Sequence, residues 1–197
     1  MNIKYLEIKA HPKVEPEDFN FVINKTINRL HGLFRSQEIR AGLDLPRSTD
    51  TSLGDKIRVF GREPVLNAVL NNAGIQELER RTMIRLQSVK NIPEGARKIR
   101  VKRIRNKDNN ELLKKARKKR EFLLSKGAQP EVIDSIQALK AQKRNREHLP
   151  YFLIEKDGRK HSVFFAWAAV DEEASWSEAG FNSYGLSSNP AGYAYRF

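Results

Sequence analysis

The chain has 197 residues, of which 39% are hydrophobic, and 37 basic against 24 acidic side chains give a net charge of +13. The absence of cysteine excludes disulfides, thiolate zinc sites and cysteine nucleophiles, and it suits a reducing compartment. The polar N-terminus has no signal-peptide hydrophobic region, and no apolar run is long enough to cross a bilayer. We therefore expect a cytoplasmic protein without a membrane partner.

Hydrophobic periodicity in the first 93 residues predicts six elements in the order β-α-β-β-α-β. The first helix is the clearest, because Pro16 suits its first turn and Ile23, Ile27 and Leu30 recur at helical spacing. Gly74 is a plausible end for the second helix. This order is the ferredoxin-like (RRM-like) arrangement, a common scaffold for RNA recognition. The predicted strands cover residues 2–10, 41–46, 55–61 and 81–90, and the predicted helices cover residues 15–37 and 62–74.

A different pattern follows a linker-like stretch at residues 91–96. We predict an α+β protein in which a ferredoxin-like domain over residues 1–93 precedes a second domain over residues 94–197 with a basic helix and a β-hairpin. Asp157 and Gly158 form the strongest hairpin signal of the chain. The elements predicted for the second domain are a strand over 97–107, helices over 108–127 and 130–148, a hairpin over 150–168 and a glycine- and aromatic-rich tail over 180–197.

Positive charge is concentrated between Arg97 and Arg120, where thirteen Lys and Arg residues face only Asp108 and Glu111. A concentrated excess of one sign indicates that a polyanion binds at one place, and nucleic acid is the first candidate. An anionic membrane surface is a weaker one, because this segment has no tryptophan. The alternative is a solvated helix face without a partner.

His31 lies in "NRLHGLF", residues 28–34, on the predicted first helix. An imidazole, with an ordinary pKa of about 6.5, suits acid–base catalysis at neutral pH. Gly32 beside it adds no side chain and would let a phosphate approach closely. The alternative is a core histidine that shares a helix face with Ile27 and Phe34, and this motif alone does not decide between the two.

Four segments together resemble the type I-F (Csy-type) CRISPR-associated endoribonucleases, which process pre-crRNA. The resemblance extends in the right order over almost the whole chain, and "SYGLS" at residues 183–187 is its most specific motif. It implies metal-independent cleavage of CRISPR repeat RNA at the 3′ base of a hairpin, without a cofactor, leaving a 2′,3′-cyclic phosphate and a 5′-hydroxyl. It also implies that the enzyme stays on the mature crRNA as a subunit of a type I-F surveillance complex. The four segments are "RLHGLF", "SLGDKIRVFG", "RIRNKDNNELLKKARKK" and "GFNSYGLSS".

The resemblance also assigns roles to residues. His31 would be the catalytic histidine, and Tyr184 would line the active site beside it. Arg103 and Arg105 would contact bases near the cleavage site, although Arg105 replaces the glutamine that the family has there. Lysine replaces most of the family's arginines on the basic helix, which favours phosphate contacts over base readout. The RNA-contacting residues implied for that helix are Lys114, Lys115, Arg117, Lys118 and Lys119.

Two positions depart from the family pattern. The first strand of the hairpin lacks the family's active-site serine and has Glu155 or Lys156 in its place. Where the family has an aromatic residue that stacks on the terminal base pair, this chain has Ser162, with Phe164 two residues later. The alternatives to an active nuclease are therefore a family member that only binds the RNA hairpin, and an unrelated structural RNA-binding protein.

Overall fold

The structure is a computed structural model that describes residues 3–104, 117–118, 120–127, 129, 149–156, 158–170 and 174–197. The chain forms two compact units, one of Met1–Ile104 with Leu149–Phe197 and one of Arg105–His148. The predicted boundary after residue 93 falls within the first unit. The predicted domains, 1–93 and 94–197, therefore do not coincide with the two compact units. The domain division stays a prediction.

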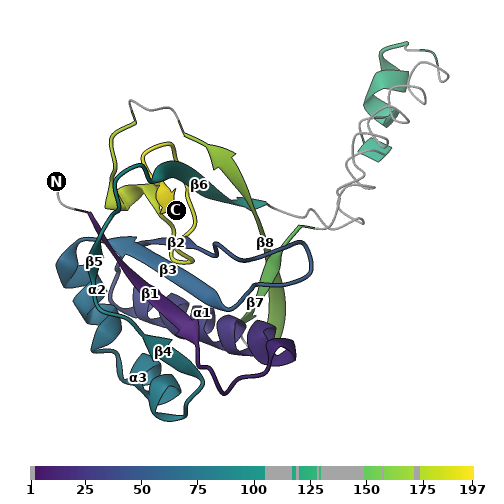
Figure 1. Cartoon of the computed structure of the whole chain (residues 1–197). Coiled ribbons are helices and arrows are strands. Elements are labelled where there is room, and N and C mark those ends of the chain that lie inside the picture. Colours follow the sequence, from purple (N-terminus) through teal and green to yellow (C-terminus); the bar gives the residue numbers. More distant parts are fainter. Residues whose placement is uncertain are drawn as a thin grey trace. The chain divides into compact units, whose positions relative to one another are not determined.

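The predicted α+β class is confirmed. The first sheet has the strand order β2-β3-β1-β4, and β5 also pairs with β1. Each of these pairings is antiparallel. Figure 1 shows α1 lying across one face of this sheet. The elements are β1 (Lys4–Ala10), η1 (Pro16–Asp18), α1 (Phe19–Ser36), β2 (Gly42–Asp44), β3 (Lys56–Gly61), α2 (Glu63–Leu70), α3 (Ala73–Arg80), β4 (Ile84–Leu86) and β5 (Lys90–Asn91).

The predicted second helix is wrong in its extent. The helix does not continue to Gly74 but ends at Leu70, as α2. A further helix, α3, follows at Ala73–Arg80, and the sequence pattern did not predict it. Asn72 caps α3, because its side-chain Oδ1 accepts a hydrogen bond from the backbone N–H of Ile75 (3.1 Å). Gly74 thus lies in the first turn of α3. The strand predicted over 81–90 is also interrupted, since two short segments pair with β1 in its place, β4 at Ile84–Leu86 and β5 at Lys90–Asn91.

The second sheet has the order β7-β8-β6-β9. The predicted hairpin is confirmed: Lys156 pairs with Arg159, and Gly158 has the positive φ (69°) that such a turn favours. The glycine-rich tail supplies β9, which was not predicted. The strands are β6 (Arg97–Ile104), β7 (Tyr151–Lys156), β8 (Arg159–Ala169) and β9 (Ala194–Arg196).

Both sheets contribute to one hydrophobic core. Leu6 and Ile27 of the first half belong to the same buried cluster as Val101, Phe152 and Phe165 of the second half. Burial of large aliphatic and aromatic side chains is the main stabilising contribution to folding. This shared core explains why residues 149–197 belong to the same compact unit as the N-terminal elements.

The predicted basic helix falls mostly outside the described residues. Residues 120–125 are helical, and Gly127 has a φ of 80° just beyond them, as expected for a glycine that ends a helix. The helix predicted over 130–148 lies outside the described residues. Among those that are described, no helix combines the length and apolar character that a membrane span requires.

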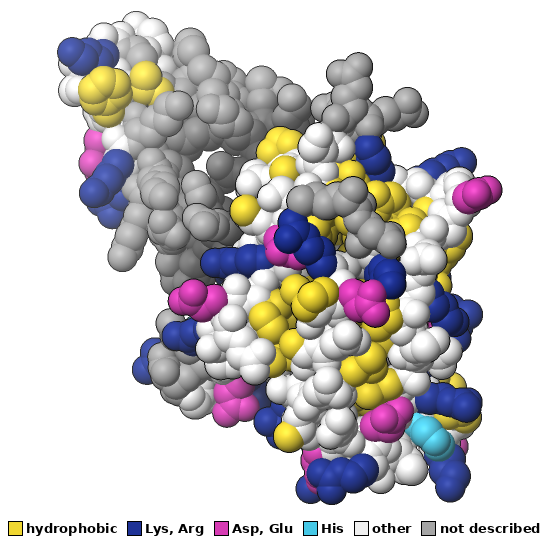
Figure 2. Space-filling model, turned by 90° about the vertical axis from the view of Figure 1, so that its left-hand side faces the viewer, with side chains coloured by type: hydrophobic (Ala, Val, Ile, Leu, Met, Phe, Trp, Pro, Cys, Tyr) yellow, Lys and Arg dark blue, Asp and Glu magenta, His cyan; other side chains and the backbone are white. Residues whose placement is uncertain are grey.

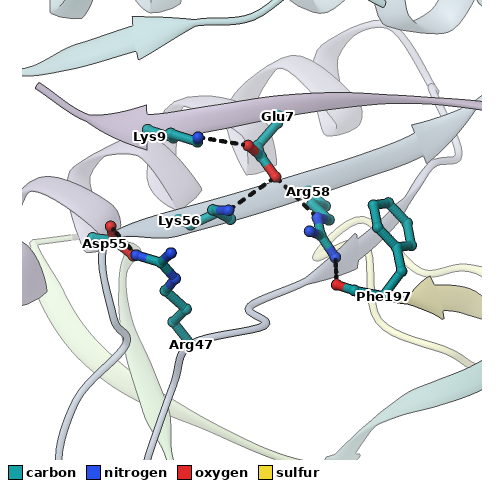
Figure 3. A network of polar contacts seen from close by, with 7 residues as sticks. All are labelled: Glu7, Lys9, Arg47, Asp55, Lys56, Arg58 and Phe197. Atoms are coloured by element: carbon teal, nitrogen blue, oxygen red, sulfur yellow. Dashed lines mark hydrogen bonds and ion pairs between the residues drawn. The ribbon is translucent and has the colours of Figure 1, made fainter. Parts of the chain in front are cut away.

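A buried ion network lies on the face of the first sheet that carries Tyr5 and Phe60. Figure 3 shows the Glu7 carboxylate accepting from Lys9, Lys56 and Arg58, at 3.1, 3.2 and 3.0 Å. Arg58 also donates to the backbone oxygen of Phe197 (2.9 Å), and its guanidinium lies 3.8 Å from the Phe197 ring centroid. This network therefore fixes the C-terminal tail against the first sheet.

The pKa of Glu7 predicts how stability depends on pH. Burial alone would raise this pKa, but hydrogen bonds from Lys9, Arg58 and Lys56 lower it from 4.5 to about 2. A lowered folded-state pKa stabilises the protein above the unfolded-state value, and this contribution, on the order of 3 kcal/mol, disappears as the pH falls from about 4.5 towards 2. Glu7→Gln should therefore reduce the free energy of unfolding most near pH 7.

Denaturant unfolding of wild type and Glu7→Gln at pH 7, 4.5 and 3 measures this effect. The difference between the two proteins should shrink as the pH falls. Glu94→Gln, at an exposed position, is the control and should change little at any pH. If Glu7→Gln lowered the free energy of unfolding equally at pH 7 and pH 3, the charge of Glu7 would not be the stabilising feature.

Candidate active site

A polar row on α1 faces the edge strand β7. Asn24 and Asn28 lie one helical turn apart, and His31 continues the same row. The Asn24 Oδ1 accepts from the N–H of Leu153 (2.5 Å), and the Asn28 amide donates to the carbonyl of Leu153 (2.6 Å). Asn28 Oδ1 also accepts from the N–H of Glu155 (3.3 Å). The two asparagines thus satisfy the outer edge of β7 and fix α1, with His31, beside the hairpin.

The "SYGLS" segment forms a tight loop against both sheets. The Asn182 Oδ1 accepts from the N–H groups of Tyr184 (2.9 Å) and Leu186 (3.2 Å). Gly185 has a φ of 71°, and a Cβ at this position would meet the side chain of Leu43, so the position requires glycine. The N–H of Leu43 donates to the Gly185 carbonyl (2.8 Å), and the N–H of Ser187 donates to the Val101 carbonyl (2.8 Å). These bonds hold the loop between β2 and β6.

This loop orients His31. The imidazole Nδ1 lies 2.8 Å from the carbonyl oxygen of Ser183. A carbonyl only accepts hydrogen bonds, so Nδ1 carries a proton, and the neutral ring presents the lone pair of Nε2. His31 is half-buried, whereas Leu30 and Leu33 beside it are buried, and a side chain at Gly32 would meet nothing within 4 Å. His31 is therefore accessible from solvent and does not belong to the buried core.

Tyr184 and Arg103 complete this cluster. The His31 and Tyr184 rings are stacked, with centroids 4.4 Å apart and planes 13° apart. The Arg103 guanidinium lies 5.1 Å from the Tyr184 ring centroid, within cation–π range. Among the hydrogen bonds between described residues, none joins the Tyr184 hydroxyl to His31; the two residues contact each other through their stacked rings. The site thus combines an oriented imidazole, an aromatic support and a nearby cation.

The structure brings together three of the predicted site residues, namely His31, Tyr184 and Arg103. Arg117 and Lys118 belong to the second unit, where both side chains are exposed and the Arg117 Nε lies 3.4 Å from Glu121. The remaining predicted RNA-binding residues lie outside the described part of the chain; they are Arg105, Lys114, Lys115 and Lys119.

Sequence reasoning missed the groups that hold the site in place. The carbonyl of Ser183 could not be found from its residue type, because every residue has a backbone carbonyl. The spacing of Asn24 and Asn28, four residues apart on a helix, was a usable signal for a polar row that faces a partner.

The hairpin positions that depart from the family pattern are ordered. Glu155 is exposed at the end of β7, and its backbone N–H is the one bonded to Asn28. Ser162 is opposite Leu153, so it has no aromatic partner across the hairpin. Phe164 is opposite Tyr151, and their ring centroids are 5.3 Å apart. The hairpin therefore presents an aromatic pair two residues from Ser162, the position at which the resemblance implies a stacking aromatic residue.

Two further properties, metal ligation and surface charge, concern the described part of the chain and one face of it, respectively. Among the described residues, no group of three or more His, Asp and Glu side chains is placed to hold a metal ion. The face drawn in Figure 2 carries Lys and Arg side chains interspersed with Asp and Glu side chains. That face therefore lacks the uniform charge that attracts a polyanion.

Taken together, these elements define an α+β protein with an accessible histidine that a backbone carbonyl orients and a tyrosine supports, an arrangement suited to acid–base chemistry. Over residues 5–192 the chain matches the family described as CRISPR-associated protein (Cas_Csy4), and it belongs to this family. No curated protein matches it. The resemblance found in the sequence is thus confirmed: this is a family of type I-F CRISPR endoribonucleases that process pre-crRNA and bind the crRNA repeat hairpin.

Proposed function

We propose that this protein is a metal-independent endoribonuclease that cleaves CRISPR repeat RNA at the 3′ base of a hairpin. It remains bound to the mature crRNA and forms part of a type I-F surveillance complex. The observation that carries the proposal is the orientation of His31 by the Ser183 carbonyl, 2.8 Å from Nδ1, which leaves Nε2 to accept a proton. We further assign the order β1-α1-β2-β3-α2/α3-β4 to the ferredoxin-like arrangement.

In the proposed reaction, the ribose 2′-hydroxyl attacks the adjacent phosphorus. The Nε2 of His31 takes the 2′-hydroxyl proton, the bond from O2′ to phosphorus forms, and the bond from phosphorus to O5′ breaks. The 5′ oxygen takes up a proton from water as it leaves, so the products are a 2′,3′-cyclic phosphate and a 5′-hydroxyl. General-base assistance of this kind typically accelerates a reaction by about 10²–10⁴-fold.

Tyr184 and Arg103 have supporting roles in this reaction. The stacked tyrosine restricts rotation of the imidazole and leaves its edge free for the 2′-hydroxyl. Arg103 is exposed beside this pair. A guanidinium there can donate to a phosphate oxygen or to a guanine edge of the RNA near the cleavage site.

The basic segment supplies the affinity for the hairpin in this proposal. A basic helix would contact RNA phosphates through Lys114, Lys115, Arg117, Lys118 and Lys119, and Arg105, just before this helix, would contact a base near the cleavage site. Lysine ammonium groups act as point charges and position a backbone without reading its sequence. Tight binding by this segment is also what would keep the cleaved crRNA on the enzyme.

A second candidate function is an inactive subunit that only binds the hairpin. The observation that favours it is that the first strand of the hairpin has Glu155 or Lys156 where the family has a serine. Both functions predict hairpin binding, and only the first predicts cleavage.

One assay separates the candidates. The protein is incubated with a panel of type I-F repeat hairpin RNAs in EDTA, and binding, cleavage and product ends are measured together. Cleavage that leaves a 2′,3′-cyclic phosphate is the expected result. Binding without cleavage would support the inactive subunit, and a requirement for Mg²⁺ would rule out the proposed mechanism.

A further inference from the structure

We propose that a groove between α1 and β7 binds the single-stranded RNA that follows the scissile phosphate on its 3′ side. This inference rests on the proposed function, since it names a further part of the same RNA substrate. The groove has a volume of about 680 Å³ and lies wholly within the first compact unit. It is distinct from the basic segment that we propose for the hairpin.

The groove runs along the helix that carries His31. Its lining includes Asn20, Asn24 and Asn28, the polar row that His31 continues. At a rise of about 1.5 Å per residue, the helix axis spans about 15 Å between Phe21 and His31. That is a distance that a few nucleotides of an extended strand can cover. An RNA strand that passes His31 can therefore continue directly into the groove.

Asparagine side chains hold both walls of the groove in place. Asn20 Oδ1 accepts from the N–H of Leu53 (2.7 Å), and its Nδ2 donates to the carbonyl of Thr51 (3.3 Å), which fixes the loop on one side. Asn24 and Asn28 fix β7 on the other side, through the backbone bonds described above. The groove is thus formed before any ligand binds, as is usual for binding sites.

Exposed aromatic rings and cations line this groove. The Phe21 side chain is 60% exposed and that of Tyr151 is 47% exposed, which is a large apolar area to leave in contact with water. The Lys25 ammonium lies 5.4 Å from the Phe21 ring centroid, so an aromatic face and a positive charge stand side by side. Unpaired bases stack on aromatic rings while nearby cations neutralise phosphates, and this combination is typical of single-strand binding.

The charge balance of the groove suits a strand that must leave after cleavage. Lys25, Arg29 and Lys160 contribute positive charge, and Asp50 and Glu155 contribute negative charge, so the excess is small. The basic segment at residues 97–120 carries a much larger excess, as the retained crRNA requires. A modest affinity in the groove fits the leaving strand, because its release would allow the enzyme to keep only the hairpin.

The test compares three RNAs that carry a 2′-deoxy substitution at the cleavage position, so that binding is measured without cleavage. One is the minimal repeat hairpin from the panel above, one is extended by about five nucleotides on the 3′ side, and one carries the same extension on the 5′ side. The 3′ extension should tighten binding by about tenfold. The 5′ extension should have a much smaller effect.

Two double variants test the role of the rings. F21A/Y151A should abolish the gain from the 3′ extension, whereas F21Y/Y151F, which keeps both rings, should retain it. Melting temperatures of both variants are measured alongside, and each variant should fold. The inference would be overturned if F21A/Y151A kept the gain in affinity from the 3′ extension, or if it lost affinity equally for the minimal and the extended RNAs. A gain in affinity from the 5′ extension alone would also overturn it.

The outcomes also separate this inference from the proposed function. Cleavage of the unmodified minimal hairpin with no effect of a 3′ extension would remove the groove assignment and leave the nuclease intact. A protein that neither binds nor cleaves any hairpin in the panel would overturn both.

Discussion

His31→Ala should lower the single-turnover cleavage rate by about 10²–10⁴-fold and change the dissociation constant for the hairpin by no more than a few-fold. The substitution removes the group that we propose as the base, while the positive charges of the basic segment, which would supply the affinity, stay in place. Since His31 is half-buried and outside the core cluster, the loss of its stack on Tyr184 should cost only about 1 kcal/mol of stability.

Melting temperature, dissociation constant and cleavage rate should be measured on the same preparation. His161→Ala is the matched control, because His161 is an exposed histidine on β8, outside the cluster of His31, Tyr184 and Arg103. This control should cleave normally. If His31→Ala instead lost stability, binding and cleavage in parallel, His31 would have a structural role and the proposed mechanism would be wrong.

Hairpin binding should depend steeply on salt. With about six phosphate contacts, the slope of log affinity against log salt concentration should be roughly −4 to −5, which corresponds to a loss of several hundred-fold between 50 and 200 mM salt. Replacing Lys114, Lys115 and Lys118 with Glu should weaken hairpin binding at low salt by at least several hundred-fold. It should also flatten the slope, because fewer counterions are released when the RNA binds.

A second triple reversal controls for net charge alone. Lys13, Arg85 and Lys90 are exposed residues of the first unit outside the basic segment, and reversing all three changes the net charge by the same amount. This variant should keep most of the affinity and the full salt slope. Equal losses in the two triple variants would mean that overall charge, and not the basic segment, attracts the RNA.

Hydrophobic periodicity and turn residues predicted the helices and strands that are determined by residues close together in the sequence. The helix over residues 15–37 and the hairpin at residues 157–158 could be read from the sequence, because hydrophobic spacing and turn residues determine them. The start of α3 was missed because Gly74 was read as a stop, whereas the capping asparagine two residues before it determines where that helix begins.

The C-terminal tail could not be predicted in the same way. Its order depends on contacts with residues far away in sequence, such as Gly185 against Leu43 and Phe197 against Arg58. No local pattern encodes such contacts. For the same reason, the pairing of His31 with Tyr184 was available only from the resemblance to a family, and the Ser183 carbonyl was not available at all.

The distance in sequence between His31 and its orienting carbonyl, 152 residues, determines when the enzyme becomes competent. The helix that carries His31 is synthesised first, and the loop that orients its imidazole follows about 150 residues later. Contacts of such long range close late in folding, because the entropy of joining distant segments must be overcome first. A nascent chain that has not yet reached Ser183 therefore carries the histidine without its orienting carbonyl, and the proposed ribonuclease activity should arise only after residues 183–187 have been synthesised.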